Sequence, residues 1–316
     1  MTITSDSTPI ISLKQYLPTS VSHSLTRLSK SCLDKISEIR LRAGSVISVT
    51  VEGENLFLTQ SGISKDPTGA INLTREQLED FIYKFCKGSV YTHESTLCDF
   101  YITNGGIRVG IGGECIAREN GKFCVGNISS LNIRIPRHIP GCSKILMEHI
   151  IKNGFNDGKG ILIASNPGVG KTTLLRDLAI QLSSGKRLGD GFSPKRVTVI
   201  DERDEIYLPG IFSKSICDFL SGMTKIKGIE IACRVLSPQI IICDEIASPE
   251  EAEKITRAKN SGIIFIASIH SDSFENALKK DYIKNMFDKG VFGTCLTLSG
   301  HGEKMKSEIH EYIPCP

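Results

Sequence analysis

Tryptophan is absent from the 316 residues of this sequence, which removes a common stacking and interface residue. Long apolar runs are missing as well, since none approaches the roughly 20 residues that a helix needs to cross a bilayer. The first residues show no basic segment followed by an apolar core, so no signal peptide is visible. The net charge of +3 is small and by itself argues neither for nor against a nucleic-acid partner. We therefore expect a cytoplasmic protein that reaches a membrane, if at all, through a partner.

Paired cysteine motifs are also missing. The sequence has 11 cysteines, an odd number, and none of them forms a Cys-x-x-Cys pair. Several lie within apolar runs. This distribution predicts reduced, buried thiols and excludes a disulfide framework or a zinc site with the usual ligand spacing.

One stretch, residues 165–173, gives the strongest functional signal. It follows the apolar run 161–164, which predicts a buried strand, and it precedes leucines at helical spacing. A strand, a glycine-containing turn, Lys-Thr and a helix are together typical of a phosphate-binding P-loop. The residues that we expect to contact a nucleotide are Ser165, Asn166, Pro167, Gly168, Val169, Gly170, Lys171, Thr172 and Thr173.

Each part of this loop has an expected role. Gly168 and Gly170 let backbone N–H groups point inward, and the start of the helix adds the positive end of its dipole. Lys171 is expected to reach the β- and γ-phosphates, and the Thr172 hydroxyl to bind Mg²⁺. Ser165 stands where the pattern has its first glycine; because serine is small, we expect the loop to close. The alternative is an ordinary glycine-rich turn.

Two carboxylates end the most apolar strand that the sequence predicts, residues 240–243. Asp244 is expected to hold Mg²⁺ through water, and Glu245 to orient the attacking water as the general base. A second predicted strand, 197–200, also ends in acids. There Asp201 could support the metal, while Glu202 or Glu205 competes with Glu245 as the base. The alternative in both places is a solvated charge cluster at a strand end.

The predicted strand 263–267 leads to a third polar group. Ser268 and His270 follow it directly, at the edge of the sheet where ligands of such folds bind. Ser268 or His270 is therefore a candidate sensor of the γ-phosphate, and the alternative for His270 is an ordinary satisfied histidine. The sequence contains no Asn/Thr-Lys-x-Asp motif for guanine, so ATP is favoured over GTP.

The rest of the chain indicates two domains. At 40% hydrophobic and 23% charged residues, a chain of this length can bury two cores. The N-terminal half reads as α+β: a strand at 36–42, a helix after the capping box of Thr74 and Gln77, and a hairpin at 100–111. The glycines at 110–113 suggest close strand packing rather than a second phosphate loop. We expect an N-terminal α+β domain at 1–140, a P-loop ATPase domain at 141–300, and a tail at 301–316.

From residue 159 onward, apolar strands alternate with helical segments. One helix is expected over 226–236, and another begins with Ser248 as its N-cap and Pro249 in its first turn. This alternation predicts an α/β domain with a mainly parallel sheet that is covered on both faces.

These motifs together resemble the stage III sporulation protein AA ATPases, relatives of the ring-forming type II and type IV secretion ATPases. The resemblance runs from about residue 36 to about 300. In the C-terminal half the matching segments are 166–177, 199–206, 218–222 with Lys225 and Gly228, 234–238, 244–246 and 267–270. In the N-terminal half they are 38–42, 89–91, 108–110 and 129–135. Ser165 and a small insertion at 188–195 depart from the family pattern.

The resemblance implies a RecA-like P-loop NTPase domain and a Mg²⁺-dependent ATPase that assembles as a ring, by family likeness a hexamer. Such a ring would energise a secretion-like channel through membrane-anchored sporulation proteins. Secretion-type ATPases place arginines from the N-terminal half at the nucleotide, which makes Arg108 and Arg134 catalytic candidates. The alternative for both is pairing with surface acids.

Two other functions fit parts of the sequence. A nucleic-acid-associated P-loop motor would use the basic residues of the N-terminal half, but no aromatic residues interleave with them as a stacking platform requires. We therefore expect no nucleic-acid partner. A nucleotide-gated scaffold with little turnover is the other alternative; Lys171, Thr172, Asp244 and Glu245 are all present and argue against it.

Overall fold

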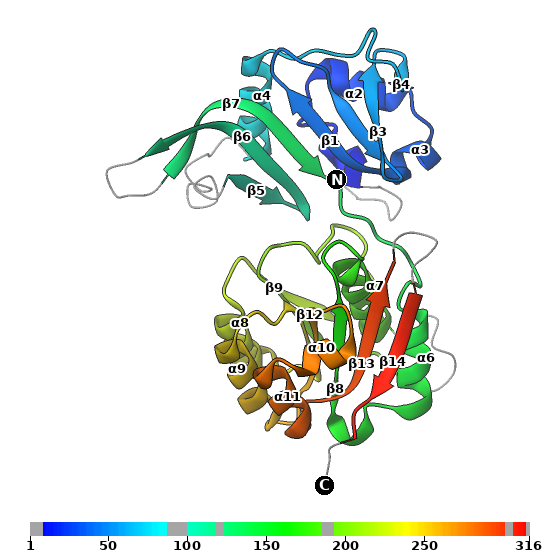
Figure 1. The fold of residues 1–316 in the computed structure, drawn as a ribbon, viewed down its shortest axis with the longest axis vertical. Coiled ribbons are helices and arrows are strands. Elements are labelled where there is room, and N and C mark those ends of the chain that lie inside the picture. The colour runs from blue at the N-terminus through cyan, green and yellow to red at the C-terminus, as the bar shows by residue number, and fades with distance from the viewer. Residues whose placement is uncertain (1–8, 87–99, 118–122, 185–192, 301–305, 314–316) are drawn as a thin grey trace. The chain divides into compact units, whose positions relative to one another are not determined.

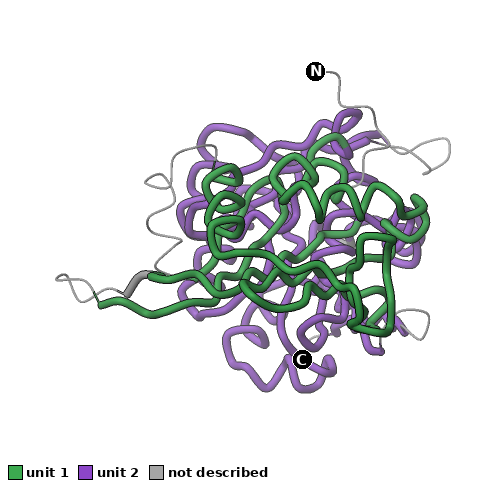
Figure 2. The backbone as a smooth tube through the Cα atoms, turned by 90° about the horizontal axis from the view of Figure 1, so that it is seen from above, with its two compact units in different colours: residues 1–137, 208–210 green, residues 138–207, 211–316 purple. Residues whose placement is uncertain are grey.

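The computed structural model describes residues 9–86, 100–117, 123–184, 193–300 and 306–313. The chain divides into two compact units, which Figure 2 shows in two colours. Unit 1 comprises residues 1–137 and 208–210, and unit 2 comprises residues 138–207 and 211–316. Two segments that we singled out lie outside the described residues: the motif at 89–91 and most of the insertion at 188–195.

Unit 1 is a seven-stranded antiparallel sheet in the order β4-β3-β2-β1-β7-β6-β5 (Figure 1). The strands are β1 (Ile36–Arg42), β2 (Ser48–Val51), β3 (Glu54–Thr59), β4 (Gly62–Ser64), β5 (Tyr101–Asn104), β6 (Ile107–Ala117) and β7 (Phe123–Arg134). Its helices are α1 (Pro9–Leu13), α2 (Thr19–Thr26), α3 (Lys30–Lys35) and α4 (Arg75–Phe85). Apolar residues of the helices and of alternating strand positions form one buried cluster, so the helices cover one face of the sheet.

Local chemistry explains several of these elements. Thr74 and Gln77 form the predicted capping box at the start of α4, and the predicted hairpin is β5 and β6. A Cβ atom on Gly112 would lie 2.4 Å from Ser130 Oγ, and one on Gly113 would lie 2.5 Å from the Asn127 carbonyl oxygen. These glycines therefore allow β6 and β7 to approach closely, as the sequence suggested.

Unit 2 is a second seven-stranded sheet, in the order β10-β9-β11-β12-β8-β13-β14. The strands are β8 (Gly160–Ser165), β9 (Val197–Asp201), β10 (Cys217–Ser221), β11 (Ile240–Glu245), β12 (Ile264–His270), β13 (Phe292–Ser299) and β14 (Lys306–Glu311). All neighbours pair in parallel except β13 and β14. The segment expected as a tail, 301–316, thus contains an edge strand of this sheet.

Helices cover both faces of this sheet. Ile161 and Ile163 pack into a core with α6 (Lys144–Asn153) and α7 (Lys171–Ser184). Leu162 and Ala164 point to the other face, where the core is completed by α8 (Lys225–Ile231), α9 (Pro249–Lys259), α10 (Phe274–Leu278) and α11 (Asp281–Asp288). The predicted α/β domain with a mainly parallel, doubly covered sheet is confirmed. No helix among the described residues is both long and apolar enough to span a bilayer.

Two predicted helices in unit 2 begin and end close to where the sequence suggests. The Ser248 side chain accepts a hydrogen bond from Glu251 N, so it caps α9 as expected. The helix predicted over 226–236 consists of α8 followed by a π-helical turn at Ala232–Leu236. It ends at Ser237, whose φ of 48° takes the backbone out of the helix.

Candidate nucleotide-binding site

The P-loop joins β8 to α7 as the sequence predicts. Gly168 and Gly170 have φ values of +78° and +112°, a region of backbone conformation that favours glycine. A Cβ atom on either residue would meet nothing within 4 Å, so these glycines are needed for the curl of the backbone rather than for space. The loop therefore has the conformation that lets successive N–H groups face a phosphate.

Ser165 is accommodated as the last residue of β8. It is buried and pairs with His270 on β12 and with Leu298 on β13. Its backbone is extended within the strand, so this position does not require the conformational freedom of glycine. The Ser165 hydroxyl donates a hydrogen bond to the Asn166 carbonyl at 2.9 Å. The departure from the usual loop pattern therefore leaves the loop closed.

Lys171 lies at the start of α7 with only 7% of its surface exposed. Its Nζ donates to the Ser165 carbonyl at 3.2 Å and to the Ser165 hydroxyl at 3.4 Å, and it lies 2.8 Å from His270 Nδ1. Burial lowers the pKa of Lys171 from its usual value, while the nearby Glu245 and Asp244 act in the opposite direction. The ammonium group is thus held by neutral acceptors inside the loop, where a phosphate oxygen could replace them.

His270 connects this lysine to an acid on another strand. Its Nε2 lies 3.2 Å from Glu245 Oε2, while its Nδ1 faces Lys171 Nζ. A lysine ammonium can only donate, so Nδ1 is the acceptor and Nε2–H donates to the carboxylate. The structure therefore brings three predicted catalytic residues into one continuous chain of contacts.

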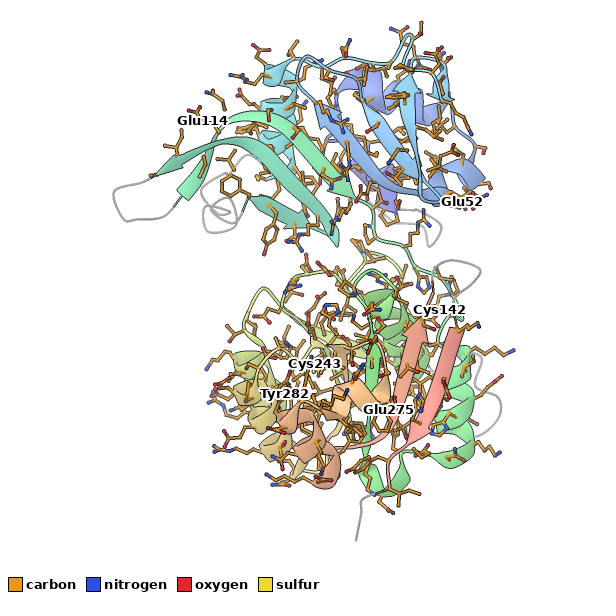
Figure 3. All side chains as sticks on the ribbon, viewed as in Figure 1. Glu52, Glu114, Cys142, Cys243, Glu275 and Tyr282 are labelled. Carbon is orange, nitrogen blue, oxygen red and sulfur yellow. The ribbon has the colours of Figure 1, made fainter. Side chains whose placement is uncertain are left out.

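The neighbouring acid, Asp244, is held separately. The Ser268 hydroxyl of β12 donates to Asp244 Oδ1 at 3.2 Å, and Ser268 is fully buried. Cys243, labelled in Figure 3, precedes Asp244 in β11. Thr172 and Thr173 lie half-buried in the first turn of α7, whereas Asn166 and Pro167 are exposed and Val169 packs into the core.

Asp201 has a different environment from the metal position that we expected. It is fully buried, and its carboxylate accepts backbone N–H bonds from Glu205 at 2.8 Å, Ile206 at 2.7 Å and Tyr207 at 2.9 Å. Burial raises the pKa of Asp201 to about 6, although the three donors lower it. A carboxylate occupied in this way anchors the loop after β9, and this geometry argues against a metal role.

Arg176 holds the same loop from the other side. This residue of α7 is buried, its Nε donates to the Ile206 carbonyl at 2.7 Å, and its Nη2 donates to the Glu205 carbonyl. Burial lowers the pKa of Arg176 to about 10, against the effect of the nearby Asp201. Glu205 therefore contributes its backbone to a fixed loop.

The next residue of α7, Asp177, fixes a second segment. Its fully buried carboxylate accepts hydrogen bonds from Gly141 N at 3.0 Å, Ser143 N at 2.9 Å and Ser143 Oγ at 2.6 Å. Gly141 and Ser143 follow the point where the chain passes from unit 1 into unit 2. The P-loop helix is thereby tied to the beginning of its own unit.

Glu202 lies near a lysine whose place in the site the sequence did not reveal. Lys225, at the start of α8, is only 4% exposed, and its Nζ lies 3.7 Å from Glu202 Oε2 and 3.1 Å from Glu251 Oε2. It also donates to the Glu245 carbonyl. Tyr282, labelled in Figure 3, lies close enough to Glu245 and Glu251 that both acids add to the rise that burial causes in the pKa of its phenol.

Two of these structural residues could have been predicted from the sequence, because they are charged residues within an apolar helix. The helix after the P-loop is apolar on several sides, so Arg176 and Asp177 within it had to find partners inside the protein. The sequence around Lys225 does not predict its burial, because its partners Glu202, Glu245 and Glu251 are brought together only by the fold.

The two candidate arginines belong to unit 1. Arg134 Nε lies 3.5 Å from Glu38 Oε1, and the Arg108 guanidinium lies over the Tyr101 ring, 4.1 Å from its centre. These contacts are within unit 1, so a role for either arginine at a nucleotide stays a prediction.

Among the described residues, no group of three or more His, Cys, Asp or Glu side chains forms a candidate metal centre. Of the predicted metal ligands, Asp244 lies near enough to Lys171 to act on its charge, and Thr172 is the second residue of α7. Such a small protein donor set fits Mg²⁺, which takes one or two protein ligands and completes its shell with phosphate oxygens and water.

Several solved structures have a similar architecture. The structure of the ATPase DotB from Legionella pneumophila aligns with a TM-score of 0.59 over 93% of this chain and 81% of that one, at 15% identity. The pilus retraction motor PilT aligns with a TM-score of 0.60 over 90% of this chain and 82% of that one, at 14% identity. These similarities show that the chain has the RecA-like fold of secretion ATPases.

Sequence comparisons are more specific. The stage III sporulation protein AA of Bacillus subtilis is 30% identical over 307 residues, which cover 95% of this chain and 94% of that protein. The Arabidopsis thaliana protein SEEDLING PLASTID DEVELOPMENT 1 is 28% identical over 193 residues, or 59% of this chain and 26% of its own length. The model of the family described as sporulation stage III, protein AA, matches residues 12–310. The chain therefore belongs to the sporulation stage III protein AA family.

Proposed function

We propose that this protein binds ATP at the P-loop and hydrolyses it to ADP and phosphate in a Mg²⁺-dependent reaction. The observation that carries the proposal is the chain of contacts from Glu245 through His270 to Lys171. It places a carboxylate, an imidazole and an ammonium at the carboxyl ends of neighbouring strands, beside a loop that is shaped for phosphate. The solved structure of PilT, which is similar in fold, has ADP bound, and this supports nucleotide binding by the present protein.

Each residue of the site has a role in the proposed reaction that follows from its chemistry. Lys171 and the N–H groups of the loop bind the β- and γ-phosphates, and Thr172 with Asp244 would hold Mg²⁺, which supplies charge neutralisation to the phosphates. Glu245 accepts the proton of the attacking water as that water bonds to the γ-phosphorus and ADP leaves. His270 holds the Glu245 carboxylate. When ATP binds, a phosphate oxygen replaces His270 as the partner of Lys171.

The wider role follows the family. We propose that the protein assembles with itself as a ring, in keeping with a hexamer, and powers a secretion-like channel by binding membrane-anchored sporulation proteins at the cytoplasmic side. Nucleic acid is not expected as a partner. In such a ring, Arg108 or Arg134 would reach the γ-phosphate in its own subunit or a neighbour's, where a guanidinium stabilises the transferred phosphoryl group.

The decisive experiment compares three amide substitutions. Glu245→Gln should retain ATP binding and lose turnover by orders of magnitude, because an amide cannot act as a general base. Glu202→Gln and Glu205→Gln are the matched controls and should retain most of the activity. ATP turnover is measured beside native mass, with and without DNA.

The outcomes separate the possible functions. A fully active Glu245→Gln with an inactive Glu202→Gln or Glu205→Gln would move the base to the loop after β9. Stimulation by DNA would favour a nucleic-acid motor, and ATP binding without turnover in the unchanged protein would favour a nucleotide-gated scaffold.

A further inference from the structure

Lys225 is the most deeply buried lysine at this edge of the sheet, and the proposed reaction does not use it. Its ammonium group has three contacts: the Glu245 carbonyl, Glu251 Oε2 at 3.1 Å and Glu202 Oε2 at 3.7 Å. Two of these contacts are hydrogen bonds, to the Glu245 carbonyl and to Glu251, and the contact with Glu202 is an ion pair. Removing such a charge from water is costly unless it is paired, and here two carboxylates and a carbonyl compensate it.

The three partners of Lys225 come from three different segments. Glu202 follows β9, Glu245 ends β11, and Glu251 lies in the first turn of α9. Glu251 Oε2 also accepts the Ala247 N–H at 2.9 Å, so the turn between β11 and α9 is fixed at both ends. Lys225 therefore joins the strand ends that carry the two competing candidates for the general base.

The helix that presents Lys225 is itself closely packed. Gly228 lies one turn further along α8, and a Cβ atom at that position would lie 2.6 Å from Ile200 Cγ2 of β9. Only glycine allows α8 to approach β9 this closely, and this approach sets the depth at which Lys225 enters the site. The close packing of α8 on β9 and the burial of Lys225 are two independent observations, and both indicate that Lys225 has a fixed position at this edge of the sheet.

The contacts around Glu245 are divided between its backbone and its side chain. Lys225 holds the carbonyl oxygen, whereas His270 holds the carboxylate. Fixing both ends of one residue limits its backbone shift and its side-chain rotation at once. Because misplacement of a reacting group by about 1 Å can reduce a rate about 100-fold, such a double restraint has a direct catalytic consequence.

We infer that Lys225 is a positioning residue: it fixes the backbone of Glu245 for proton transfer and keeps Glu202 beside it as a second, ion-paired acid. This inference rests on the proposed function, since it acts through Glu245. In this inference Lys225 acts through Glu245 and is therefore a positioning residue, not a catalytic one.

The test uses the full-length protein and the double substitution Lys225→Met with Glu251→Gln, which removes both charges and leaves no unpaired buried carboxylate. The maximal turnover of ATP should fall about 10- to 100-fold, while the affinity for a fluorescent ATP analogue with Mg²⁺ stays unchanged. Lys225→Arg retains the positive charge and should recover part of the turnover. Lys227→Met is the matched control, since Lys227 lies on the same helix, is 58% exposed and pairs with Glu230.

Two further measurements show whether Lys225 acts through Glu245. Adding Lys225→Met with Glu251→Gln to Glu245→Gln should reduce turnover no further, because the positioned group is already gone. The ring ¹⁵N resonances of His270, assigned with His270→Gln, should shift in the double variant and stay in place in Lys227→Met. This second readout does not depend on hydrolysis, so it separates failure of the inference from failure of the proposed ATPase activity.

The inference is overturned by either of two results. One is a folded double variant with unchanged turnover and unchanged His270 resonances. The other is a loss of turnover that multiplies with that of Glu245→Gln, which would mean that Lys225 acts independently of Glu245.

Discussion

Ser143→Ala offers a quantitative test of how the P-loop helix is held in its unit. The substitution removes the 2.6 Å hydrogen bond from Ser143 Oγ to Asp177 Oδ2 and leaves both backbone donors of Asp177 in place. A buried hydrogen bond to a charged group contributes about 1.5–3 kcal/mol, so we expect a loss of about 2 kcal/mol in the free energy of unfolding. Asp177→Ala removes the acceptor of four donors, since Gln181 Nε2 also donates to Asp177 Oδ1 at 3.4 Å, and it should cost on the order of 5 kcal/mol.

Far-UV circular dichroism during urea and thermal unfolding is the appropriate assay, because the sequence contains no tryptophan to report on unfolding. For a unit of this size, each kcal/mol lowers the melting temperature by roughly 2–4 °C. Ser183→Ala is the control: its hydroxyl bonds within α7 to the Ala179 carbonyl, a bond that contributes little to a helix. If Ser143→Ala is no more destabilising than Ser183→Ala, the link between Asp177 and the start of unit 2 does not carry the stability assigned to it.

The remaining predictions concern the site, the thiols and the assembly. Lys171→Ala should abolish hydrolysis and weaken nucleotide binding, since it removes the cation nearest the transferred phosphate; near-normal turnover would refute the P-loop assignment. Burial raises the pKa of four thiols from 9.0 to about 12, so the neutral buried thiols stabilise the fold fully below pH 9, and this stabilisation is lost as the pH rises toward 12; alkylation at pH 8 should modify exposed Cys115 before these four. The four are Cys142, Cys217, Cys243 and Cys295. Mixing Arg134→Ala with Glu245→Gln, each inactive alone, should restore turnover if Arg134 acts across subunits; co-assembly without recovery would exclude that role.

The elements that the sequence predicted best depend on local chemistry. Strands β8, β9, β11 and β12 are short apolar runs buried on both faces, and such runs need no information from distant residues. The caps of α4 and α9 depend on side chains three residues apart. For the same reason, the P-loop could be recognised from its nine residues together with the apolar strand before it and the leucines after it.

The elements that were missed depend on tertiary packing. Helix α2 has the sequence Thr-Ser-Val-Ser-His-Ser-Leu-Thr, which has little intrinsic helix propensity, yet Val21 and Leu25 hold it in the core. Strand β10 lies at an edge of its sheet with no fully buried residue, so it lacks the apolar signal of the central strands. The environment of Asp201 could not be predicted for a similar reason, since its three backbone donors come from a loop whose course the sequence does not reveal.

The order of the strands explains why a histidine connects the lysine and the acid of the site. Strand β12 lies between β8 and β11, and neighbouring strands are about 4.8 Å apart, so the ends of β8 and β11 are separated by nearly 10 Å. A residue at the end of β12 can bridge this gap only if it has two polar atoms on opposite sides. The imidazole of His270 has them, with Nδ1 toward Lys171 and Nε2 toward Glu245. The motifs supplied the candidate residues one by one, but the parallel order of three strands makes them a single site.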